Sequence, residues 1–142
     1  MSGSHALLFA QTANTDLCQL VAAAADLCRK PLRHGVRIQG QPTAEDCCLV
    51  LEVRDALGQR LGDQDLEVEL YMSGEVSRAT LHLTIAWLGD PDQPMLWQGQ
   101  HPVWMDAQGQ RCGCPPDGMA LEALARRLAA LLAPGSAPRP DR

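Results

Sequence analysis

The chain has 142 residues, of which 46% are hydrophobic and 20% are charged. This length and this apolar fraction are typical of one globular domain and argue against a disordered chain. The formal net charge of -5 disfavours non-specific binding to nucleic acid or to anionic lipid, because both require a basic surface. No apolar stretch reaches the roughly 18 residues that membrane insertion requires. The expected partner is therefore a protein or a small molecule.

The N-terminal part of the chain predicts a strand followed by a helix. The apolar run over residues 6–10 suits a short buried strand. Polar side chains at 14–16 suit the start of a helix, and Pro31 ends it because proline cannot donate to the helical ladder. Between these limits the apolar residues recur at helical spacing on one face. They are Leu17, Leu20, Val21, Ala24, Leu27 and Cys28.

After residue 35 the apolar period changes from that of a helix to the alternation of a strand. Alternating runs over 36–39, 49–54, 66–72 and 81–87 predict antiparallel strands with one buried face. A last strand is predicted over 95–105, at an edge or with a bulge, because Gly99 and Pro102 interrupt it. The polar side of these strands is expected to be exposed. It carries Glu67, Glu69, Tyr71, Thr80, His82 and Thr84.

The C-terminal part predicts a loop over 106–118 and then a second amphipathic helix that Asp117 caps. The tail over 136–142 has the composition of a disordered end. Two helices with one apolar stripe each need a sheet face to cover. The sequence therefore predicts an α+β domain over 1–135, with two layers, a mainly antiparallel sheet of about five strands, and both helices packed on one face.

Cys112 and Cys114, together with His101, form the sharpest chemical pattern in the chain. Zinc sites commonly have roughly two to four residues between paired cysteines, whereas one residue separates this pair. Two free thiols or a local disulfide are the alternative interpretation. A cysteine nucleophile with His101 as its base is a further possibility. Since no established catalytic or phosphate-binding motif is present, we expect no enzymatic activity and no cofactor, and a zinc- or thiol-dependent protein is the alternative.

The three tryptophans lie in the last two predicted strands. Trp87 shares the parity of the core residues, whereas Trp104 alternates with Val103 and Met105 and is expected to be exposed. Tryptophan is enriched among the residues that anchor protein interfaces. We therefore predict a partner-binding surface that contains Trp97, Trp104, Tyr71 and His82; the alternative is that Trp97 and Trp104 only cover the end of the sheet.

The order of these elements and the segment Gly74-Glu75-Val76-Ser77-Arg78-Ala79-Thr80-Leu81-His82-Leu83-Thr84-Ile85-Ala86-Trp87 resemble the lipopolysaccharide-assembly lipoprotein domain and related small accessory lipoproteins. The resemblance implies a non-catalytic plug or adaptor for a larger assembly. The given sequence begins without a leader or a lipid-attachment cysteine, and its six cysteines suit a reducing compartment. A cytoplasmic location is expected, and a periplasmic one is the alternative if a leader precedes this sequence.

These observations lead to one functional hypothesis. The protein is expected to be a non-enzymatic binding or assembly-accessory module that acts through an exposed sheet face or an edge strand. Its partner is expected to be another protein or a second copy of this chain. A periplasmic accessory protein for envelope assembly is the second alternative, beside the zinc- or thiol-dependent protein.

Overall fold

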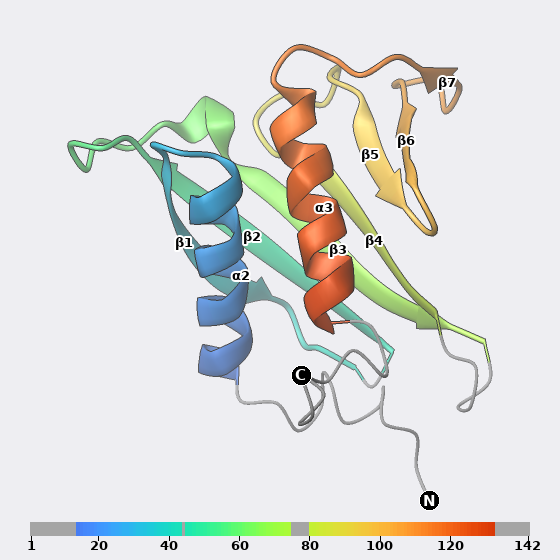
Figure 1. Ribbon diagram of the computed structural model, residues 1–142, viewed down its shortest axis with the longest axis horizontal. Helices are drawn as coiled ribbons and strands as arrows, with labels where there is room; N and C mark the ends of the chain where they lie inside the picture. The colour runs from blue at the N-terminus through green and yellow to red at the C-terminus, as the bar shows by residue number, and fades with distance from the viewer. Residues whose placement is uncertain (1–13, 44, 75–79, 133–142) are drawn as a thin grey trace, which may run out of the picture.

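Two helices and a seven-stranded sheet make up the computed structural model, which describes residues 14–43, 45–74 and 80–132 (Figure 1). The strand predicted over 6–10 and the tail over 136–142 lie outside the described residues. In chain order the elements are α2 (Asn14–Cys28), β1 (Arg33–Gln39), β2 (Asp46–Arg54), the 3-10 turn η1 (Gly62–Gln64), β3 (Leu66–Ser73), β4 (Thr80–Trp87), β5 (Met95–Gln98), β6 (Pro102–Met105), β7 (Arg111–Cys112) and α3 (Gly118–Leu132).

The sheet is an antiparallel meander in which the spatial order of the strands is the order of the chain. The predicted α+β class with an antiparallel sheet is confirmed, but the expected number of five strands is wrong. The segment 95–105 is a hairpin of β5 and β6 rather than one strand, because the chain turns at Gly99 and resumes at Pro102. The short strand β7 lies in a segment expected to be a loop and pairs with the end of β6.

Both helices cover the same face of the sheet, side by side, as Figure 1 shows. Leu51, Val68 and Leu83 on this face are fully buried and share one core with Val21 of α2 and Leu124 of α3. The burial of each large apolar side chain contributes roughly 1.5–3 kcal/mol. Leu17, Val21 and Ala24 of the predicted α2 stripe lie in this core, and Cys28 packs against it. The expected burial of Leu20 and Leu27 is wrong, since both are exposed.

Trp104 is a core residue, and its expected exposure is wrong. Only 4% of its surface is accessible, because its register opposite Leu96 places it on the side that the helices cover. Its indole stacks on Trp87 with ring centroids 6.1 Å apart, and its Nε1 donates a hydrogen bond of 2.7 Å to Oε2 of Glu122. A side chain at Gly118 would come within 2.9 Å of this ring, so the glycine leaves the space that Trp104 fills.

Candidate binding site on the open sheet face

The sheet face away from the helices gathers three of the predicted partner-binding residues. Tyr71 of β3 lies directly opposite His82 of β4, and Trp97 of β5 lies opposite Thr84 of β4. Side chains at directly opposed and diagonal positions on one sheet face are close enough to touch. The antiparallel register of three successive strands thus brings together residues that are far apart in the sequence.

The three rings form one stacked group, which we call the aromatic cluster (Tyr71, His82 and Trp97). The imidazole of His82 stacks on Tyr71 at a centroid distance of 5.1 Å and on Trp97 at 5.8 Å, with interplanar angles of 20° and 19°. The indole Nε1 of Trp97 donates a hydrogen bond of 2.8 Å to the hydroxyl of Tyr71. All three side chains are half-buried, so they are held in place while part of each ring still faces solvent.

The imidazole of His82 is positioned by Ser73, whose Oγ lies 2.6 Å from Nε2. A serine beside a histidine resembles the first two members of a hydrolytic triad, but that chemistry needs a third group that orients the base through its other nitrogen. Here Nδ1 is buried and has no hydrogen-bond partner among the described residues. Among the described residues, His82 therefore has no carboxylate that would orient it as a catalytic base.

A pocket of about 430 Å³ opens beside the aromatic cluster, at the end of the β3–β4 and β5–β6 hairpins. A side chain at Gly99 would come within 2.7 Å of the indole of Trp97, so this glycine lets the ring lie against the turn. Seven residues line the pocket: Ser73, Thr80, His82, Trp97, Gly99, Gln100 and His101.

Two carboxylates stand on the same face, next to the cluster. Glu69 pairs across the strands with Thr84 and Cys48, and Glu67 pairs with Ala86. Burial, together with these two carboxylates, raises the pKa of the Cys48 thiol to about 11. Neither glutamate forms an ion pair with a described residue. The face therefore combines aromatic surface with unneutralised negative charge.

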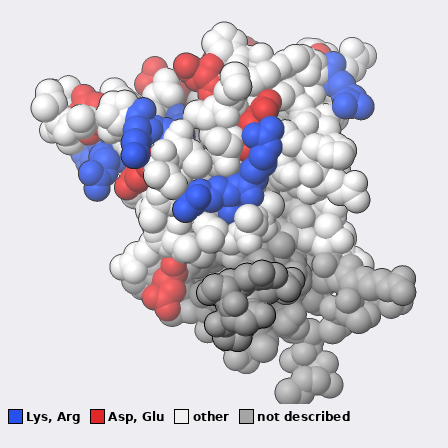
Figure 2. Space-filling view, in the orientation of Figure 1, with Lys and Arg blue, Asp and Glu red and all other residues white. Residues whose placement is uncertain are grey.

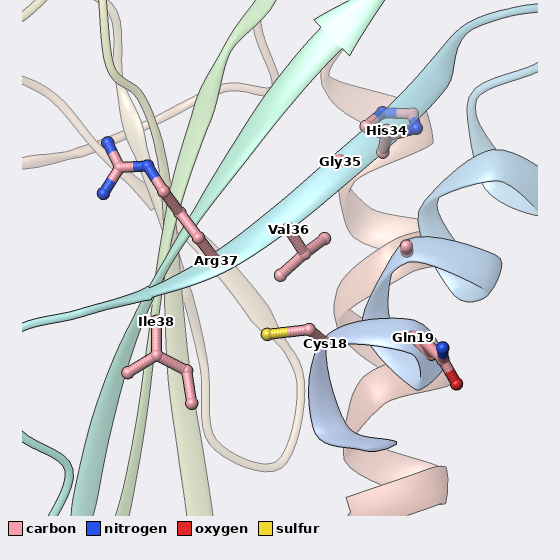
Figure 3. Close-up of a pocket in the computed structure, with 8 residues that line it drawn as sticks. Cys18, Gln19, His34, Gly35, Val36, Arg37 and Ile38 are labelled. Carbon is pink, nitrogen blue, oxygen red and sulfur yellow. The ribbon is translucent and has the colours of Figure 1, made fainter. Parts of the chain in front are cut away.

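The edge strand β1 offers a second surface, a pocket of about 450 Å³ between β1 and α2 (Figure 3). Helix α2 supplies partners for the outward-facing amides of this strand. The amide of His34 donates to Oδ1 of Asp26 at 2.8 Å, and the backbone of Ile38 interacts with the thiol of Cys18, which Figure 3 shows pointing toward β1. Natural sheets protect their edges in such ways against pairing with other chains. This edge is therefore a poorer template for strand addition than its position suggests.

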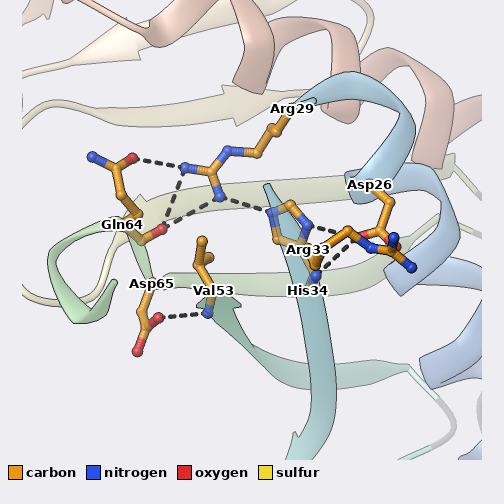
Figure 4. A network of polar contacts seen from close by, with 7 residues as sticks. All are labelled: Asp26, Arg29, Arg33, His34, Val53, Gln64 and Asp65. Atoms are coloured by element: carbon orange, nitrogen blue, oxygen red, sulfur yellow. Dashed lines mark hydrogen bonds and ion pairs between the residues drawn. The ribbon is translucent and has the colours of Figure 1, made fainter. Parts of the chain in front are cut away.

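A buried polar network joins α2, β1 and η1 (Figure 4). Nδ1 of His34 lies 2.9 Å from Asp26, and Nε2 lies 3.0 Å from Nη1 of Arg29, whose guanidinium also donates to Gln64. Burial lowers the pKa of His34 although the hydrogen bond to Asp26 acts in the opposite direction. Because Arg29 can only donate, Nε2 is the acceptor and Nδ1 carries the proton. Both ring nitrogens are thus engaged, and the carboxylate–imidazole pair holds elements together.

The predicted zinc ligands do not converge. Cys112 pairs with Trp104 at the far end of β6 from His101, and His101 instead lines the pocket beside the aromatic cluster. Cys112, Cys114 and His101 are all exposed. Among the described residues, no three His, Cys, Asp or Glu side chains are grouped so that they could hold a metal ion.

Residues 18–131 match a family described as a domain of unknown function (DUF8659). The chain belongs to this family. The match extends from α2 to α3 and includes every strand of the sheet. Comparisons with curated proteins and with solved structures find no match. Within the described ranges, no helix combines the length and the apolar character needed to cross a membrane.

The sequence pattern indicated the three rings of the site but not the residues that position them. Gly99, which makes room for Trp97, was interpreted only as a break in a strand, and Ser73, which orients His82, was not singled out. A glycine two residues after an aromatic strand residue is a usable signal, since it allows the ring to fold back onto the turn. The hydrogen bond between Ser73 and His82 depends on the β3–β4 register, which the sequence does not state.

Proposed function

We propose that this domain is a non-enzymatic binding module that holds a protein partner on the open sheet face, with the aromatic cluster as its anchor. The observation that carries the proposal is the preorganisation of the three rings. The hydrogen bonds from Trp97 to Tyr71 and between Ser73 and His82 fix the rings before a partner arrives. Rigid aromatic anchors lose little conformational entropy on binding, which is why they dominate many interfaces.

The neighbouring pocket supports the same proposal. Its volume of about 430 Å³ suits one large side chain of a partner, which would contact the rings of His82 and Trp97 that line it. The β1 edge is the weaker candidate because Asp26 and Cys18 already engage its amides. An adaptor in a larger assembly, as the lipoprotein resemblance implies, is compatible with an anchor of this kind.

The replacement of Trp97 by alanine tests this function. The native domain and the Trp97→Ala variant are immobilised and exposed to extract of the native organism, and the retained proteins are compared by mass spectrometry. We expect at least one protein that the native domain retains to be reduced about tenfold or more on the variant, as for the loss of an interface anchor.

The matched control is Met119→Ala. Met119 is a large apolar residue at the start of α3, 77% exposed on the helix side of the molecule. Its replacement should leave the retained proteins unchanged. If every protein retained by the native domain is retained equally by a folded Trp97→Ala variant, the proposed function is wrong.

A further inference from the structure

We infer that the segment held on the open face is basic, and that an arginine side chain of the partner lies on the aromatic cluster beside Glu69 and Glu67. This inference rests on the proposed function and names the class of partner.

The central part of the open face carries negative charge only. Over β3, β4, β5 and β6, the residues of this face include two carboxylates, Glu67 and Glu69, and no lysine or arginine. The arginines of the same face stand on strands outside this central part. Arg37 of β1 is paired with Glu52 at 3.8 Å. The face is therefore complementary to a positively charged segment and repels an acidic one.

The strand register places the carboxylates and the indole on either side of two small residues of β4. Glu69, Thr84 and Trp97 lie in one cross-strand row on β3, β4 and β5, and Glu67 lies opposite Ala86. Thr84 and Ala86 are small and half-buried, so neither side chain extends far above the sheet between the carboxylates and the indole. A long side chain can lie across these two residues with its charged end near a glutamate and its flat surface on a ring.

An arginine side chain can interact with both the aromatic rings and the carboxylates. Its planar guanidinium stacks on an indole or phenol ring and also donates charge-assisted hydrogen bonds to a carboxylate. Lysine supplies the charge without the planar surface and should bind more weakly. Burial is the main reason that the pKa of the Cys48 thiol is raised, and the negative charges of Glu67 and Glu69 raise it further.

The helix side of the molecule carries charges of both signs. Figure 2 shows lysine and arginine side chains next to aspartate and glutamate over that side. One such pair is Arg126 and Glu122 of α3, 3.4 Å apart. A second copy of the chain is a poor occupant of the open face, since each copy carries a formal net charge of -5.

The test uses a defined probe, a blocked ten-residue peptide of alternating arginine and serine. Its counterpart has glutamate in place of each arginine. The chain has three tryptophans, so a proton–nitrogen NMR spectrum of the native domain shows three indole signals, and Trp97→Phe identifies that of Trp97. We expect the arginine peptide to shift the Trp97 signal but not those of Trp87 and Trp104, with an effect that decreases as salt is added. The glutamate peptide should shift none of them.

The double variant Glu67→Gln/Glu69→Gln removes the charge and keeps the shape of the face. It should weaken binding of the arginine peptide about tenfold or more. Glu52→Gln is the matched control, because Glu52 is on the same face but already paired with Arg37. It should leave the affinity for the peptide within about twofold of the native value.

Two outcomes overturn the inference: an arginine peptide that leaves the Trp97 signal in place, or a double variant that binds it as tightly as the native domain does. These results are separable from the fate of the proposed function. If Trp97→Ala loses a partner from extract while the double variant retains that partner, the proposed binding function is supported. The inferred preference for a basic segment is then wrong. If Trp97→Ala loses no partner, the proposed function itself fails.

Discussion

Trp97 and Trp104 have opposite environments although they lie on adjacent strands. Trp97 is half-buried on the open face, while Trp104 is 4% exposed beneath α3. The difference is one of parity, since successive side chains of a strand point to opposite faces and a shift of one residue exchanges the faces. The turn between β5 and β6 sets that parity by aligning Leu96 with Trp104 and Trp97 with Val103.

Trp104→Ala should therefore destabilise the fold more than Trp97→Ala does. The loss of a buried tryptophan costs about 3–5 kcal/mol, and the change also removes the indole donor from Glu122. Urea unfolding followed by circular dichroism measures the free energy of unfolding of both variants. Trp104→Phe, which keeps a ring but loses the donor, should lie between the native protein and Trp104→Ala. Equal losses for the two alanine variants would contradict the assignment of Trp104 to the core.

At the scale of elements, the β5–β6 hairpin contains both Trp97, the proposed anchor, and Gly99, which makes room for its ring. The turn after β5 contains Gly99, which lies against the indole of Trp97, and the residues that follow line the pocket. The position of the indole therefore depends on a turn that makes no contribution to the hydrophobic core. Binding and stability should be separable at this hairpin.

Gly99→Ala tests that separation. An alanine Cβ would lie 2.7 Å from the ring, so the indole must move and its hydrogen bond to Tyr71 should be lost. We expect a displaced Trp97 indole NMR signal and a several-fold weaker association with the arginine peptide, with little change in the free energy of unfolding. Gly113→Ala is the control, because a side chain there meets nothing within 4 Å. An unchanged Trp97 signal in Gly99→Ala would show that the turn does not position the ring.

At the scale of the whole molecule, buried polar groups join elements that also share the hydrophobic core. His34 joins β1 to α2 through Asp26 and Arg29. Asp65 accepts hydrogen bonds from the amide of Val53 and from Arg60, and the two-point contact with Arg60 lowers the pKa of this carboxyl. Both groups link the protonation of one side chain to the stability of the fold.

The free energy of unfolding should fall as the pH is lowered, in two separate ranges. Burial lowers the pKa of His34 in the folded state, so its contribution is complete above about pH 6.5, the ordinary pKa of histidine, and decreases as the pH falls below that value. The contribution of Asp65 is present above its ordinary pKa near 3.8 and is lost as the pH falls through its lower folded-state pKa.

His34→Gln tests the first range. Glutamine can donate to Asp26 and accept from Arg29 but does not titrate, so the decrease in stability between pH 7.5 and 5.5 should be smaller in the variant. Chemical denaturation at a series of pH values measures both curves. The other three histidines are present in both proteins, so the difference isolates His34. Parallel curves would show that His34 is not the titrating group.

The local sequence pattern was sufficient to predict the two helices and most of the strands. The apolar stripe from Leu17 to Cys28 and the alternation through 66–72 and 81–87 predicted elements that the structure contains, because each pattern repeats the geometry of one element. The same alternation placed Tyr71 and His82 on the exposed face and predicted that both helices cover the other one. The helical stripes and the strand alternation depend only on residues that are near one another in the chain.

The remaining features depend on contacts between residues that are far apart in the chain. Trp104 is buried because β6 pairs with β5 in one register and α3 then covers it. His101 lies beside the aromatic cluster rather than beside Cys112 because it precedes β6, whereas Cys112 pairs near the other end of that extended strand. The local order of residues specifies which side chains alternate and which faces are apolar. Strand pairing decided which of them meet, because a shift of one residue moves a side chain from the core to the open face.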